Sequence, residues 1–163
     1  MTSMIDLNAI SDKHYDWVER MGWHNKTVLE SLALIASEIG EAAGECIGEI
    51  HLPRLGEELA DIVLRCTDLA KTEGVNLNEQ VARARFEWVG LTAPERIAEI
   101  LVDYATWSNT ARKVELGPDF AEGMGKVVAR VIDLAETYGI DLHEAVHLKL
   151  AKNELRGTRG RPI

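Results

Sequence analysis

Apolar residues recur at steps of three and four along most of the chain, which is the spacing of a helix face that packs against a core. One series runs from Val28 to Cys46, and a second runs from Leu55 to Leu69. No segment shows the strict alternation of apolar and polar residues that is typical of a half-buried strand. The pattern therefore predicts an all-α protein.

Glycine, proline and capping residues divide this pattern into about seven helices. We expect Ser11 to cap the first of them, and Pro53 to separate the two long series, because proline cannot donate a backbone hydrogen bond inside a helix. Thr92 and Glu95 have the spacing of a capping box at the start of a fifth helix. The expected helices cover approximately residues 12–21, 25–50, 55–73, 79–89, 93–115, 120–138 and 142–156.

A shift of 65 residues lays "ELADIVLRCTDLAKTEGVNLNEQV" over "GMGKVVARVIDLAETYGIDLHEAV", so that Gly74 falls on Gly139 and Arg65 on Arg130. A shared glycine turn, capping position and apolar register indicate two copies of one helical unit. We therefore predict a single domain over residues 1–163, built from diverged tandem repeats at about 24–89 and about 93–156. The second repeat has Gly123 opposite Glu58 and Lys126 opposite Asp61, so only the first can hold an acidic site.

Composition excludes several classes of function. The net charge of -9 opposes stable binding to nucleic acids and anionic membranes, which requires clustered basic residues. No apolar run approaches the roughly 20 residues that span a bilayer, and "MTSMIDLNAI" lacks the features of a targeting signal. Cys46 and Cys66 lie in apolar helical patterns and are expected to be buried, reduced thiols. These features predict a cytoplasmic protein without a membrane span.

Two pairs of acidic residues flank the apolar series of the second and third expected helices. Glu38 and Glu41 are three residues apart, as are Glu58 and Asp61, so each pair shares one helix face. If the helices pack through their apolar faces, the four carboxylates meet and repel unless a cation lies between them. Oxygen ligands favour Mg²⁺, with Mn²⁺ able to substitute, and Glu45 is a possible auxiliary acid. The alternative is a solvated acidic face.

The segment "SEIGE" followed by "EELADIVLRCTDLAKTEGVNL" resembles the signature of the all-α nucleoside triphosphate pyrophosphohydrolases, the superfamily of MazG-like enzymes, dCTP pyrophosphatases and dimeric dUTPases. The acids match that pattern position by position, and the resemblance covers residues 17–83. It implies Mg²⁺-dependent hydrolysis of a nucleoside triphosphate to a monophosphate and pyrophosphate, in control of the nucleotide pool. It also implies a homo-oligomer, either a dimer or a tetramer, and Glu38 or Glu41 as the general base.

The family pattern also ends with a Lys, an Asn and an Arg on a last helix, followed by a basic tail. In this chain that set is found only in the second repeat, in "HLKLAKNELRGTRGRP". The resemblance therefore implies phosphate or nucleotide binding by Lys149, Asn153, Arg156 and Arg159. The acids lie in one repeat and the cations in the other. This division leaves open whether one chain completes the site or the tail of a partner chain does so.

Trp17, Trp23 and His24 are candidates for stacking on a base, although aromatic residues on short helices more often fill a core. Two other functions compete with the enzyme. Glu144 and His147 have the spacing of a di-iron ligand pair, but no second Glu-x-x-His accompanies them. The stronger competitor is a non-catalytic helical module that binds other proteins.

Overall fold

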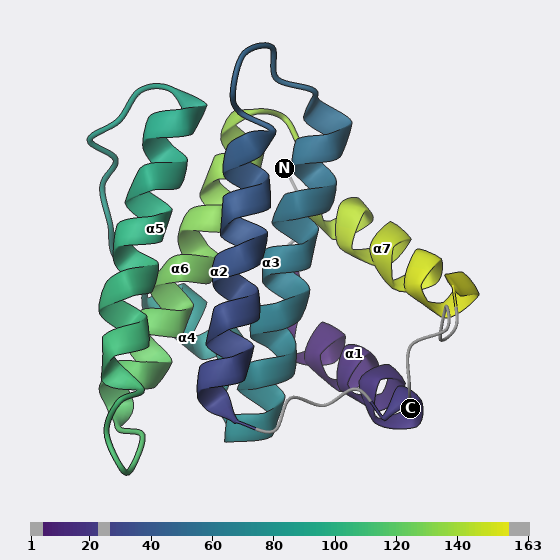
Figure 1. Cartoon of the computed structure of the whole chain (residues 1–163), viewed down its shortest axis with the longest axis vertical. Helices are drawn as coiled ribbons and strands as arrows, with labels where there is room; N and C mark the ends of the chain where they lie inside the picture. Colours follow the sequence, from purple (N-terminus) through teal and green to yellow (C-terminus); the bar gives the residue numbers. More distant parts are fainter. Residues whose placement is uncertain (1–4, 23–26, 157–163) are drawn as a thin grey trace.

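The protein is all-α, as its sequence predicts. The computed structural model describes residues 5–22 and 27–156, and within these ranges it contains seven helices and no strand (Figure 1). The helices are α1 (Leu7–Met21), α2 (Val28–Gly44), α3 (Leu52–Glu73), α4 (Leu77–Arg83), α5 (Ala93–Thr110), α6 (Pro118–Thr137) and α7 (Leu142–Arg156).

Four long helices, α2, α3, α5 and α6, lie side by side and form the body of the molecule (Figure 1). Helices α1 and α7 lie beside α3 at an angle to this bundle, and the short α4 packs against α6. Buried apolar side chains from all seven helices form one continuous core, in which Trp107 is fully buried beside Phe120. Among the helices of the described residues, none is both long and apolar enough to span a bilayer.

Several predicted helix ends are wrong, including that of α5, which ends at Thr110 instead of about residue 115. Asp6, rather than Ser11, caps α1 by accepting a hydrogen bond from the Ala9 amide at 3.1 Å, while Ser11 is buried and donates to the Thr67 carbonyl. Helix α2 ends at Gly44 instead of about Ile50. Pro53 lies in the first turn of α3 rather than before the helix, where its missing amide hydrogen costs nothing.

Helix α4 is also shorter than predicted, because the residues that follow it make tertiary contacts instead of continuing the helix. The chain is extended after Arg83 and crosses α6, where Phe86 and Trp88 lie against the guanidinium of Arg130. Helices α4 and α6 approach closely at Gly125, where a Cβ atom would lie 2.7 Å from the backbone carbonyl carbon of Gln80. These contacts outweigh the helical pattern of residues 84–89.

Several helix starts of the two halves coincide in the 65-residue register, although α7 is longer than α4. Helix α2 begins at Val28 and α5 at Ala93, each after a threonine cap. A glycine with positive φ follows each of the next helices: Gly74 caps α3 with φ of 69°, and Gly139 lies just after the cap of α6 with φ of 67°. The last helix of each half packs against the other half: α4 of the first half packs on α6, and α7 of the second half packs on α3. The last helix of the second half therefore reaches the acidic helix of the first.

Candidate metal site

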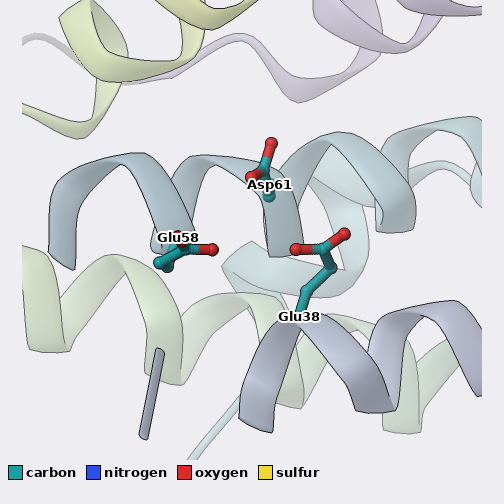
Figure 2. Close-up of side chains that lie close together, drawn as sticks. All are labelled: Glu38, Glu58 and Asp61. Atoms are coloured by element: carbon teal, nitrogen blue, oxygen red, sulfur yellow. The ribbon is translucent and has the colours of Figure 1, made fainter. Parts of the chain in front are cut away.

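Three carboxylates meet where α2 and α3 pack together. One oxygen atom each from Glu38, Glu58 and Asp61 lies within 4.8 Å of the other two. Figure 2 shows the carboxylates of Glu38 and Glu58 pointing toward one another from the two helices, with Asp61 beside them. The packing of the apolar faces brings these acids together, since Ile39 and Ile62, their neighbours in sequence, are both buried in the core. We call these three residues the acidic triad.

Two cations neutralise part of the acidic triad. The Arg65 Nε atom donates to Glu38 Oε1 at 3.1 Å, and the Lys149 Nζ atom lies 3.2 Å from Asp61 Oδ2. Two of the other oxygens, Glu38 Oε2 and Glu58 Oε2, are buried and have no hydrogen-bond partner among the described residues. Glu38 is 8% exposed, so water does not readily satisfy it. Buried polar atoms without partners are rare, and they often mark the place of an ion or a bound water.

The acidic triad also holds protons more tightly than ordinary carboxylates do. Burial, followed by the negative charge of Asp61, raises the pKa of Glu38 to about 7, although Arg65 opposes this effect. Burial also raises the pKa of Glu58 to about 7, with contributions from Glu41 and Asp61. The pKa of Asp61 is raised by burial and lowered in part by Lys149. Near neutral pH the acids therefore share protons, and a bound metal ion can take the place of those protons.

These pKa shifts predict how stability depends on pH. Between about pH 5 and pH 8, the folded acidic triad keeps protons that the unfolded chain has lost, so the free energy of unfolding falls as pH rises through this window. We expect Glu58→Gln to remove about 1 to 2 kcal/mol of this decrease, as measured by urea unfolding at pH 5.5 and pH 8. The lowered pKa of His147 makes the free energy of unfolding rise with pH, and it does so in both proteins. The measured quantity is therefore the difference in pH dependence between the variant and the wild type. Equal pH dependences in both proteins would contradict this prediction.

The other two predicted acids lie outside the triad. Glu41 is exposed on α2, one turn after Glu38, and is close enough to hydrogen-bond to Glu58 and so raise its pKa. Glu45 follows the last residue of α2 and is half-buried. The structure thus brings three of the four predicted ligands together and leaves the fourth at the rim.

The predicted cationic residues are only partly within the described chain. Lys149 reaches Asp61 in the same chain, because α7 crosses to α3. Asn153 is half-buried one turn further along α7, and Arg156 is the last residue of that helix. Arg159, like the side chain of Arg156, lies outside the described residues. One chain therefore supplies both the acids and at least one of the predicted cations.

Of the three predicted base-stacking residues, Trp17 alone lies within the described residues. Trp17 is buried in α1, where its ring stacks on His14 with centroids 5.9 Å apart. Trp23 and His24 lie outside the described residues. Among the described residues, Glu144 and His147 belong to no group of three side chains that could hold a metal ion, which gives the di-iron alternative no support.

Sequence reasoning missed four residues that form ion pairs in the two halves of the bundle, namely Arg65, Asp103, Lys126 and Arg130. Arg65 pairs with Glu38 in the first half, and in the second half Arg130 pairs with Asp103 in the same way. Lys126 lies 3.7 Å from Asp103 and adds a second cation there. The 65-residue register contained this signal, since it places Asp103 opposite Glu38 and Arg130 opposite Arg65.

Comparisons of the chain with models of known protein families, with curated proteins and with solved structures found no match. The structure therefore supports an all-α protein with a buried acidic triad that can hold a metal ion.

Proposed function

We propose that the protein is a Mg²⁺-dependent nucleoside triphosphate pyrophosphohydrolase, which converts a (deoxy)nucleoside triphosphate to the monophosphate and pyrophosphate. The observation that carries the proposal is the pair of buried, unpartnered oxygens, Glu38 Oε2 and Glu58 Oε2, in a triad completed by Asp61. The reaction class comes from the resemblance of the acidic segments to the all-α pyrophosphohydrolases. Control of the nucleotide pool and a homo-oligomeric state are parts of the same proposal.

The chemistry of the acidic triad fits Mg²⁺. Carboxylate oxygens are the hard ligands that this ion prefers, and it commonly binds through a few carboxylates together with substrate phosphates. The unpartnered oxygens of Glu38 and Glu58 are available to such an ion without breaking the hydrogen bond from Arg65. The same oxygen chemistry accepts Mn²⁺, so we expect Mn²⁺ to substitute.

Each residue has a distinct role in the proposed reaction. When bound, Mg²⁺ supplies neutralisation of phosphate charge and a lowered pKa of bound water. Glu38, Glu58 and Asp61 would hold the ion, and we assign to Glu41, at the exposed rim, the role of accepting a proton from the attacking water. Lys149 supplies positive charge beside the triad, and we assign Asn153, Arg156 and Arg159 to the phosphates or sugar.

A product analysis tests this function. The purified protein is incubated with a panel of canonical and modified nucleoside triphosphates and Mg²⁺, and the products are separated by chromatography. We expect monophosphate and pyrophosphate in equal amounts, with no turnover when a chelator removes the metal. Release of inorganic phosphate without pyrophosphate would indicate another class of hydrolase.

The second candidate function is a non-catalytic module that binds other proteins. It is favoured by the second half of the bundle, where Asp103 is neutralised by Lys126 and Arg130 and the helix pair persists without a free acidic site. Failure of every nucleotide in the panel to react, in the presence of either Mg²⁺ or Mn²⁺, would favour this module over the enzyme.

A further inference from the structure

The two halves of the bundle contain matching clusters of acids and cations. In the first half Arg65 on α3 donates to Glu38 on α2, and in the second half Arg130 on α6 donates to Asp103 on α5. Both pairs span 27 residues and occupy the same positions in the 65-residue register. An arginine that pairs with the acid of the neighbouring helix is therefore common to both clusters.

The second cation of each cluster has a different origin. In the second half it is Lys126, which belongs to α6 itself and lies 3.7 Å from Asp103. The equivalent position in the first half is Asp61, and its cation, Lys149, comes from α7. Asp103 is thus neutralised by cations of its own helix pair. One of the two cations that pair with the acidic triad, Lys149, instead comes from a separate helix.

The outer half of α7, residues 151–156, is weakly attached to the rest of the molecule. Val146 and Leu150 are buried, but beyond them Leu155 is 89% exposed. Two ion pairs connect this outer half to other helices, Lys152–Glu57 and Arg20–Glu154, and both are exposed and worth little in water. The Lys149–Asp61 pair is different, because both side chains are at least four-fifths buried, with exposures of 15% and 19%.

We propose that Lys149 is an exchangeable cation of the acidic triad, which a divalent ion displaces from Asp61, loosening the outer half of α7. This inference rests on the proposed metal site. A divalent ion held by the acidic triad would lie close to the Lys149 ammonium, and like charges at such short range repel strongly away from bulk water. Asp61 would exchange one positive partner for another, and Lys149 would become available to an anionic phosphate.

Metal affinity provides the first test. We expect Lys149→Met to bind Mn²⁺ about tenfold more tightly than the wild type in isothermal titration calorimetry, because the competing ammonium is gone. Lys152→Met is the matched control: it lies one turn along α7 and pairs with the exposed Glu57, so its Mn²⁺ affinity should stay within about twofold of wild type. Equal or weaker Mn²⁺ binding by Lys149→Met would overturn the inference.

Hydrogen exchange of the wild-type protein provides a second test that needs no variant. We expect saturating Mg²⁺ to speed amide exchange in residues 151–156 by about tenfold, while exchange in the buried part of α6 stays unchanged. Slower exchange in this part of α7 would show that Lys149 stays on Asp61, which overturns the inference but leaves the proposed function intact. Absence of any divalent-ion binding to the wild type would overturn both.

Discussion

Replacing Glu58 with Gln is expected to reduce the rate of Mg²⁺-dependent triphosphate hydrolysis by about 100-fold or more. The substitution keeps the shape of the side chain but removes one of the three negative charges that hold the ion. It also exchanges the unpartnered Oε2 atom for an amide group, which is a poorer ligand for Mg²⁺. The measurement is kcat/KM on the best substrate of the panel, at saturating Mg²⁺.

The neighbouring residue provides a matched control. Glu57 lies on the same helix, is exposed, and pairs with Lys152 instead of pointing into the acidic triad. Glu57→Gln should therefore retain kcat/KM within about twofold of wild type. Loss of activity through unfolding is not expected in Glu58→Gln, because removing one of several crowded carboxylates should raise the free energy of unfolding by about 1 kcal/mol at pH 8. Full activity in Glu58→Gln would refute the metal assignment.

Replacing Arg130 with Met is expected to lower the free energy of unfolding by about 3 kcal/mol. Arg130 is 7% exposed, and its guanidinium donates to Asp103 and, at 3.1 Å, to the Glu87 carbonyl. The guanidinium also lies 4.8 Å from the centre of the Phe86 ring and 4.7 Å from the Trp88 ring. The substitution would leave the carboxylate and the carbonyl without this donor and remove both cation–π contacts. Urea unfolding monitored by circular dichroism measures the loss.

The corresponding arginine of the first half is the control for this prediction. The Arg65 side chain is 38% exposed, and its acidic partner Glu38 has a pKa raised to about 7. At pH 6 Glu38 can carry a proton when its partner is removed, so Arg65→Met should lower the free energy of unfolding by only about 1 kcal/mol. Equal losses in the two variants would contradict the view that Arg130, unlike Arg65, is a structural link between α5, α6 and the loop that follows α4.

Helical periodicity predicted most of the fold, because the buried face of a helix leaves a regular trace in the sequence. Two apolar series face the core, as their spacing indicates: one contains Ile35 and Ile39, and the other contains Leu59 and Ile62. Capping chemistry located the start of α5, where Thr92 accepts from the Glu95 amide. Such local signals involve residues close in sequence, so they can be recognised without knowing the tertiary structure.

Helix ends were predicted less well where distant contacts decide them. The sequence pattern predicts that residues 84–89 continue α4. In the structure Phe86 and Trp88 pack on Arg130 instead, and this packing stabilises the extended chain more than further helical turns would. The start of α1 was placed too late because Ser11 and Asp6 are both good caps. Burial of Ser11 against the Thr67 carbonyl, a contact between α1 and α3, selects Asp6.

The sequence by itself determined the fold class and the two acidic pairs, since both follow from the 3.6-residue period of a single helix. Only the tertiary structure decided which acids share one site: it buried Glu38, brought Glu58 and Asp61 to it, and left Glu41 at the rim. It also decided where the cation comes from, because the crossing of α7 onto α3 carries Lys149 to Asp61 across the two halves of the chain. The physical reason is that side-chain burial and charge pairing depend on how helices pack together, and that packing involves residues far apart in sequence.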